Sequence, residues 1–119
     1  MNGSGQINSW SYEIFNLEVL ESSKLVLLEV GASWSGASHI ISSILESVAI
    51  TYNNRIKVFK LDIESNEEIK KTYSINEIPA ILFFKDGKLA DKIIGIVSKK
   101  VITNRISLIL NGANESESI

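Results

Sequence analysis

Apolar and polar residues alternate along the chain in blocks that predict a series of strands and helices. Residues 24–32 form an almost continuous apolar run, which is typical of a central strand covered on both faces. From Ser35 or Ser38 to about Tyr52, apolar residues recur at the spacing of one helix face. A buried strand is therefore expected to run into a short turn and then a helix, and the rest of the chain is organised around this turn.

The remaining blocks extend this alternation on both sides. The sequence predicts further strands at 6–11, 56–63, 80–84 and 89–94, and further helices at 12–22, 65–73 and 98–110. Asp86-Gly87 supplies the positive φ angles of a tight hairpin, so the last two strands should be antiparallel. The order is β-α-β-α-β-α-β-β-α, which predicts an α/β fold of three α/β/α layers with a central mixed sheet of four to five strands.

Length and composition fit one globular domain. The chain has 119 residues, of which 45% are hydrophobic and 22% are charged. We expect residues 6–110 to form the domain, residues 1–5 to be a disordered or tag-like N-terminus, and residues 111–119 to be a flexible polar tail. The sequence shows neither an apolar stretch of membrane-spanning length nor the pattern of a signal peptide. The cytoplasm is therefore the default location.

Charge and cysteine content exclude several classes of function. The formal net charge of -2 gives no general attraction to nucleic acid or to anionic membrane surfaces. The cysteine count is zero, so the chain as written has no disulfide, no thiolate metal ligand and no thiol nucleophile. We expect no metal and no cofactor.

The turn and several later positions together resemble the thioredoxin family. The turn reads Trp34-Ser35-Gly36-Ala37-Ser38, where that family carries Trp-Cys-Gly-Pro-Cys. Further family landmarks follow at family-like spacing, namely Glu29, Lys60, Ile78, Pro79, the Lys85-Asp86-Gly87 hairpin and Gly95. The resemblance covers residues 6–110. It implies the thioredoxin fold and a cis peptide bond before the single proline.

The two serines of the turn remove the chemistry that the resemblance would otherwise imply. In the family, the first cysteine attacks a client disulfide as a thiolate and the second cysteine resolves the mixed disulfide. An alcohol is far harder to ionise, and a helix N-terminus contributes only about 0.3–2 kcal/mol to an anion. The favoured interpretation of Ser35 and Ser38 is that they cap the helix. Ser35 as a hydrolytic nucleophile with His39 as its base is a weaker alternative, because no oriented acid is evident.

The resemblance also places an acid, Glu29, opposite a lysine, Lys60. Burial raises the pKa of a carboxyl group, and a nearby lysine opposes that shift. Without thiols Glu29 has no proton to move. It is therefore either inherited from a redox ancestor or one half of a buried polar pair, and both interpretations stay open.

A peptide-facing groove is the remaining implication of the resemblance. Its lining would be Trp34, Gly36, Ala37, Ile78, Pro79, Gly95 and Ile96. The expected partner is an extended peptide or protein client, and the chain itself is expected to be a monomer or a weak homodimer. We interpret the protein as a redox-inactive binding or scaffold domain.

The alternative is a Cys-to-Ser variant of an active thioredoxin-type thiol–disulfide oxidoreductase, which would serve cell redox homeostasis. The absence of the family prolines at Ala37 and Ser43 favours a protein that naturally lacks the thiols. Serine is the nearest isostere of cysteine, so serines at both positions favour deliberate replacement.

Overall fold

The computed structural model describes residues 5–7 and 12–117 of the chain, so residues 1–4 of the expected tag-like N-terminus lie outside the described part. In chain order the elements are β1 (Gly5–Ile7), α1 (Tyr12–Phe15), the π-helical turn η1 (Asn16–Leu20), β2 (Leu25–Gly31), α2 (Gly36–Tyr52), the 3₁₀ turn η2 (Asn53–Arg55), β3 (Ile56–Asp62), the 3₁₀ turn η3 (Ile63–Ser65), α3 (Glu67–Thr72), β4 (Ala80–Lys85), β5 (Lys88–Ile94) and α4 (Lys99–Glu117).

The strands of the described chain form one five-stranded mixed sheet in the order β1-β3-β2-β4-β5. The central strand β2 pairs with β3 in parallel on one side and with β4 in antiparallel on the other. β1 pairs with β3 in parallel, and β5 pairs with β4 in antiparallel. The predicted fold class and mixed sheet are confirmed.

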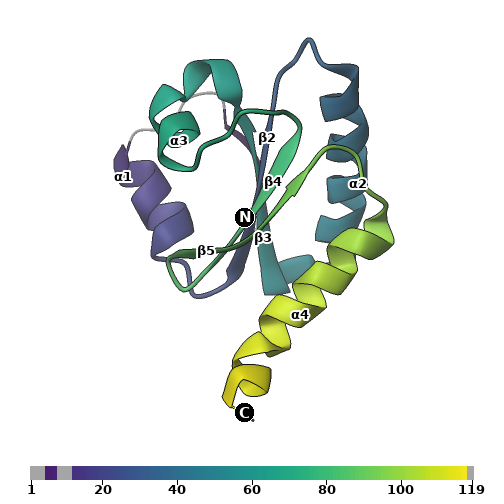
Figure 1. Cartoon of the computed structure of the whole chain (residues 1–119). Coiled ribbons are helices and arrows are strands. Elements are labelled where there is room, and N and C mark those ends of the chain that lie inside the picture. Colours follow the sequence, from purple (N-terminus) through teal and green to yellow (C-terminus); the bar gives the residue numbers. More distant parts are fainter. Residues whose placement is uncertain (1–4, 8–11, 118–119) are drawn as a thin grey trace.

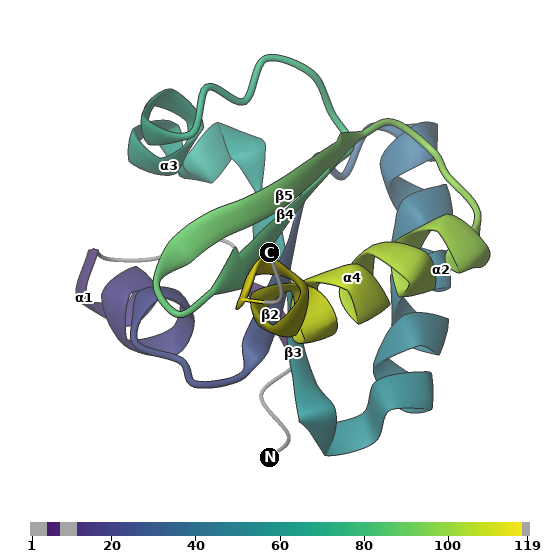
Figure 2. The ribbon, with the colours of Figure 1, turned by 60° about the horizontal axis from the view of Figure 1, so that its bottom comes forward.

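Helices cover both faces of this sheet, as Figures 1 and 2 show. On one face, Phe15 of α1 and Ile69 of α3 belong to a buried cluster with Leu28 of β2. On the other face, Leu45 of α2 and Ile102 of α4 belong to a second buried cluster. The molecule therefore has the three α/β/α layers that the alternation of strands and helices predicts.

The central strand explains why its sequence reads as an unbroken apolar run. All seven residues of β2 are buried. Because side chains alternate along a strand, Val26 and Leu28 join the cluster beneath α1 and α3. Leu25 and Leu27 join the cluster beneath α2 and α4. Each fully buried leucine of this kind contributes about 1.5–3 kcal/mol by leaving water, so β2 holds both halves of the core together.

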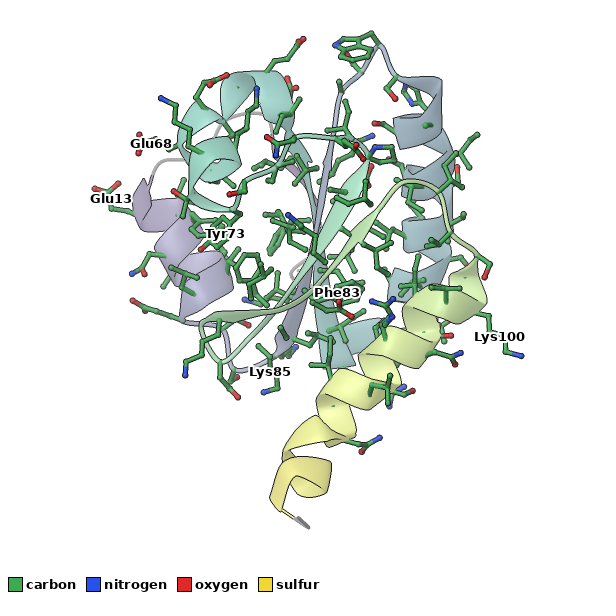
Figure 3. All side chains as sticks on the ribbon, in the orientation of Figure 1. Glu13, Glu68, Tyr73, Phe83, Lys85 and Lys100 are labelled. Atoms are coloured by element: carbon green, nitrogen blue, oxygen red, sulfur yellow. The ribbon has the colours of Figure 1, made fainter. Side chains whose placement is uncertain are left out.

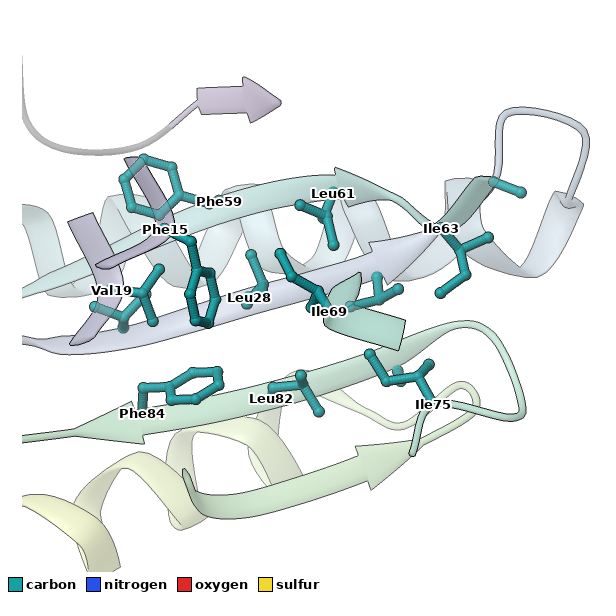
Figure 4. Close-up of a cluster of buried hydrophobic side chains, with 14 residues drawn as sticks. Phe15, Val19, Leu28, Phe59, Leu61, Ile63, Ile69, Ile75, Leu82 and Phe84 are labelled. Carbon is teal, nitrogen blue, oxygen red and sulfur yellow. The ribbon is translucent and has the colours of Figure 1, made fainter. Parts of the chain in front are cut away.

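Aromatic rings strengthen the first cluster, which Figure 4 shows in close-up. The ring of Phe84 meets that of Phe15 edge-on, with centroids 5.8 Å apart. Tyr73, which Figure 3 shows beside α1, meets Phe84 edge-on at 5.1 Å. Such edge-to-face pairs stabilise a core by about 0.5–1.5 kcal/mol each beyond the area they bury. They tie α1 and the segment after α3 to β4.

The hairpin between β4 and β5 has the backbone that its sequence predicts. Asp86 and Gly87 have φ angles of 53° and 81°, which is the pattern of the tight turns that suit twisted strands. A side chain at Gly87 would also place its Cβ 2.9 Å from the carbonyl oxygen of Leu20. Glycine is therefore required both by the backbone angle and by the close approach of η1.

Several element boundaries differ from the sequence-based expectation, among them those of the first helix, the first strand and the last helix. The first helix, expected over 12–22, continues after Phe15 as the π-helical turn η1 and ends at Leu20. The strand expected over 6–11 begins one residue earlier, as β1 (Gly5–Ile7), and residues 8–11 lie outside the described residues. The last helix, α4, continues past Leu110 to Glu117, because extending a formed helix costs little. The proposed domain boundary at 110 stays a prediction.

Candidate functional site

The turn between β2 and α2 is held by a serine hydroxyl. Ser35 has an extended backbone, with φ -96° and ψ 119°, and is the N-cap of α2. Its Oγ accepts a hydrogen bond of 3.2 Å from the backbone N–H of Ser38. Helix starts leave several N–H groups without a helical partner, and a capping hydroxyl satisfies one of them. The expected capping role of Ser35 is what the geometry shows.

Ser38 lies inside the molecule rather than at its surface. Ser38 is 1% exposed, and its Oγ accepts a hydrogen bond of 3.3 Å from the backbone N–H of Ala32. This hydroxyl therefore ties the first turn of α2 back to the chain that leaves β2. The expectation that Ser38 also caps the helix is therefore wrong: Ser35 is the N-cap, and Ser38 lies within α2 as an internal acceptor for Ala32.

Gly31 makes this inward position of Ser38 possible. A Cβ on Gly31 would stand 2.6 Å from the Oγ and 2.9 Å from the Cβ of Ser38. Real Cβ atoms essentially never approach so closely, so the strand end and the helix start fit together because residue 31 has no side chain. Gly31 was not predicted from the sequence, although a glycine at the end of an apolar strand is a signal for such a close approach.

The hydrolytic alternative lacks its essential contact. The Nε2 atom of His39 lies 2.8 Å from the carbonyl oxygen of Ser33. A carbonyl oxygen can only accept, so this ring nitrogen carries a proton and donates it to the loop. No hydrogen bond joins the His39 ring to Ser35, whose hydroxyl serves the N-cap. The pair therefore has no base positioned to activate the alcohol.

Glu29 is a buried carboxyl group in the centre of the sheet. It is 2% exposed, and Ser42 of α2 donates its hydroxyl to Glu29 Oε2 at 2.5 Å. Burial raises the pKa of Glu29, and the hydrogen bond from Ser42 and the charge of Lys60 oppose this rise. Ser42 was not expected from the sequence, because its contact depends on how α2 packs on β2.

Lys60 lies opposite Glu29 in the sheet but does not form an ion pair with it. The two residues are Cα partners in the parallel register of β2 and β3. The ion pairs of the described residues are Lys57–Glu18, Lys85–Asp86 and Arg105–Asp91. Lys60 acts on Glu29 through its charge alone, so the buried polar pair at Glu29 is made with Ser42 instead.

The residues expected to line the groove gather at one end of the sheet. The Ile78–Pro79 peptide bond is cis. Gly95, with φ 89°, donates its N–H to the carbonyl oxygen of Pro79 at 2.7 Å. In the register of the sheet, Ala80 pairs with both Val30 and Ile94, which brings the start of β4 beside the ends of β2 and β5.

Large apolar side chains at this end of the sheet are open to solvent. Trp34 is 68% exposed and Ile96 is 50% exposed. Gly36 is exposed, and Ala37 and Ile78 are half-buried. The indole Nε1 of Trp34 donates to Glu64 Oε2 at 2.9 Å, which holds the ring over the η3 turn. Sequence reasoning missed Glu64, which is thirty residues away and becomes visible only in the fold.

No group of three or more His, Asp or Glu side chains that could hold a metal ion occurs within the described ranges. The polar side chains described at this site carry hydroxyl, carboxyl, ammonium, imidazole and indole groups. Hydroxyls can cap, donate and accept. They cannot exchange with a disulfide.

Comparison with known proteins agrees with this architecture. The sequence model of the family described as Thioredoxin matches residues 6–108. The chain is 40% identical over 93 residues to Thioredoxin of Acidithiobacillus ferridurans, covering 78% of this chain and 86% of that protein. It is 34% identical over 92 residues to Thioredoxin 1 of Synechococcus elongatus, covering 77% of this chain and 86% of that protein.

A longer match is to a protein named as chloroplastic. The chain is 34% identical over 108 residues to Thioredoxin M-type, chloroplastic, of Chlamydomonas reinhardtii, covering 91% of this chain and 75% of that protein. The family match spans most of the chain, and the sheet, the cis proline and the capped turn lie where the resemblance places them. The chain belongs to the thioredoxin family.

Proposed function

We propose that this thioredoxin-family domain binds an extended peptide or protein segment at the groove residues and, as written, performs no thiol–disulfide exchange. The observation that carries the proposal is the contrast within one turn. Ser35 and Ser38 direct their hydroxyls to backbone N–H groups of the turn, while Trp34 between β2 and α2 is 68% exposed. An indole offers a large apolar face with one polar atom, a combination that is enriched at binding surfaces.

The placement of the groove residues in the fold favours an extended ligand. Trp34 and Ile96 come from different loops at the same end of the sheet, and cis Pro79 lies at the start of β4. In the family, the backbone just before this proline pairs with an extended client. Main-chain pairing of that kind gives affinity, and apolar neighbours such as Trp34 and Ile96 give selectivity.

The test is binding of peptides that cannot react with thiols. A panel of fluorescent, alkylated and unfolded peptides that includes the insulin B chain is titrated with the protein, and anisotropy is recorded. We expect saturable binding that weakens at least about tenfold in Trp34→Ala, since an aromatic anchor commonly contributes more than about 1.4 kcal/mol.

The matched control is Ile50→Ala, which removes an apolar side chain that is 79% exposed on the outside of α2. This variant should bind as the parent does. Equal binding by Trp34→Ala and the parent, or no saturable binding to any peptide of the panel, would exclude the groove as a binding site.

A second candidate is that the chain is a cysteine-free variant of a working thiol–disulfide oxidoreductase. Glu29 with its raised pKa and the helix N-terminus at Ser35 favour it, because both would serve a thiolate there. The relatives named above are called thioredoxins. Cysteine codons at positions 35 and 38 of the source gene would establish that the chain is such a cysteine-free variant.

The double variant Ser35→Cys with Ser38→Cys gives an independent measurement. If the scaffold keeps its redox machinery, the variant should reduce insulin disulfides in the presence of a thiol reductant. A folded but inert double variant would mean that more than the thiols has been lost. The parent protein is the control and should be inactive in either case.

Cellular location and assembly stay predictions. None of the helices in the described ranges is long and apolar enough to cross a bilayer. One relative is named as chloroplastic, so the expected cytoplasmic location needs a direct test by fractionation of the source cells. The expected monomer or weak homodimer is measured by sedimentation at several protein concentrations.

A further inference from the structure

A polar cleft of about 570 Å³ lies beside the turn, separate from the groove residues. Its walls include Gly31 at the end of β2, Ser33 in the turn, His39 of α2, Lys60 and Asp62 of β3, and Ser65 of η3. None of the residues that the sequence predicts for the peptide groove belongs to this lining. The volume falls within the range of about 300–1,000 Å³ that small-molecule sites occupy.

The position of the cleft in the sheet is one that α/β proteins use for ligands. β2 and β3 are parallel neighbours, and the cleft lies at their carboxyl ends. The chain leaves β2 towards α2 on one face of the sheet and leaves β3 towards α3 on the other face (Figure 1). Where the connections of adjacent parallel strands separate in this way, they open a crevice that commonly binds ligands.

The two charged side chains of the lining differ in their contacts, because Asp62 has hydrogen-bond partners and Lys60 has none within the described residues. Lys60 is half-buried, and its ammonium group donates to no acceptor and joins no ion pair within the described part of the chain. A lysine ammonium carries three donors, and leaving it partly desolvated with no acceptor in direct contact is unfavourable. A ligand with a negative group would remove this imbalance.

The other polar groups of the lining are already held in place. Asp62 accepts from the backbone N–H of Glu64 at 3.1 Å through Oδ1 and from Ser65 Oγ at 3.2 Å through Oδ2. His39 is fixed by its bond of 2.8 Å to Ser33. The walls are thus pre-formed, and the Lys60 ammonium is the cationic group that remains available inside them.

We propose that this cleft binds a compact organic anion through a carboxylate or phosphate group that pairs with Lys60. The proposal does not depend on peptide binding at the groove. An anion is expected because the Lys60 ammonium makes no ion pair within the described residues. A small ligand is expected because the η3 turn and α2 bound the cleft.

Nuclear magnetic resonance titration of the ¹⁵N-labelled full chain tests the proposal. Inorganic phosphate and succinate are added separately, which distinguishes the two kinds of anionic group. At least one of them should give saturable shifts at the amides of Gly31, Ser33 and Ser65, with millimolar or tighter affinity. Lys60→Gln should weaken that affinity by about tenfold or more, because a hydrogen bond to a charged group is lost.

Two further variants separate a specific site from general charge. Lys60→Arg keeps the positive charge and should keep most of the affinity. Lys88→Gln removes the same charge from the exposed β4–β5 hairpin at the opposite end of the sheet and should change nothing. Equal affinity in Lys60→Gln and the parent, shifts spread over all surface lysines, or no saturation with either anion would overturn the proposal.

Discussion

An alanine at position 31 should destabilise the fold although it adds a single methyl group. The new Cβ would stand 2.6 Å from Ser38 Oγ, about 0.8 Å short of ordinary contact, and 2.9 Å from Ser38 Cβ. The hydroxyl can rotate away, but the Cβ of Ser38 is fixed by the first turn of α2. The end of β2 and the start of α2 must therefore move apart, and overpacking of this kind costs about 1–3 kcal/mol.

Rotation of the Ser38 hydroxyl has a second cost. The backbone N–H of Ala32 donates to that oxygen at 3.3 Å, and Ala32 is 4% exposed. A buried donor left without an acceptor costs about 1–3 kcal/mol. The two effects overlap, since either the chain moves or the hydroxyl turns, so Gly31→Ala should lower the free energy of unfolding by about 2–4 kcal/mol.

A double-mutant cycle isolates the contact. Ser38→Gly removes both atoms that the new methyl group meets, so the cost of overpacking should vanish in Gly31→Ala combined with Ser38→Gly. The two changes should then be non-additive by about 1–3 kcal/mol, with the double variant more stable than the sum of the single effects. Urea unfolding followed by far-ultraviolet circular dichroism measures all four proteins.

Gly36→Ala is the matched control. Gly36 begins α2 in the same turn, but a Cβ on it would meet nothing within 4 Å. This change should leave stability unaltered or raise it by about 0.4–1 kcal/mol through the unfolded state. If Gly31→Ala is as harmless as Gly36→Ala, or if its effect simply adds to that of Ser38→Gly, the close packing of β2 against α2 is not what fixes the turn.

Three further outcomes follow from the same contacts. Because burial raises the pKa of Glu29 above its ordinary value of 4.5, the neutral form favours folding, and stability should fall as pH rises from about 4.5 through the raised pKa. In Glu29→Gln, the urea midpoint should depend less on pH over this range. An unchanged dependence on pH would contradict the assignment of this effect to Glu29. Ser35→Ala should lower the free energy of unfolding by about 0.5–2 kcal/mol, whereas Ser35→Asp, which keeps a capping oxygen, should not. Thermal unfolding measures both variants, and equal stability of Ser35→Ala and the parent would contradict the capping role. Leu28→Ala, at a residue 0% exposed, should cost about 2–5 kcal/mol in urea unfolding, and a loss below 1 kcal/mol would contradict its central place.

Local patterns were sufficient to predict most of the fold. The apolar run of β2 predicts a strand buried on both faces, and all of its residues are buried. Asp86-Gly87 predicts the hairpin because few other pairs accept two positive φ angles. The π-helical turn η1 has no such signature in the sequence, and it lies where the chain after α1 contacts β4 and its hairpin.

The residues of the candidate site were named from the family resemblance, but their side-chain contacts were not predicted. The resemblance located Glu29, Lys60 and Trp34, but their partners lie far along the chain. Glu29 pairs with Ser42, and Trp34 pairs with Glu64. Such pairs depend on which helix packs on which face and at what height, which residue spacing alone does not determine.

The backbone N–H of Ser38 has a different role with a serine at position 35 than it would have with a cysteine there. The N–H of Ser38 now donates to Ser35 Oγ. The same N–H, at the positive end of α2, would stabilise a thiolate at position 35. With serine at position 35, this N–H stabilises the start of the helix, whereas with cysteine it would stabilise the reactive thiolate. A domain with these serines keeps the capped turn, the exposed indole and the cis proline, while both the thiol that would attack a disulfide and the thiol that would resolve the mixed disulfide are absent.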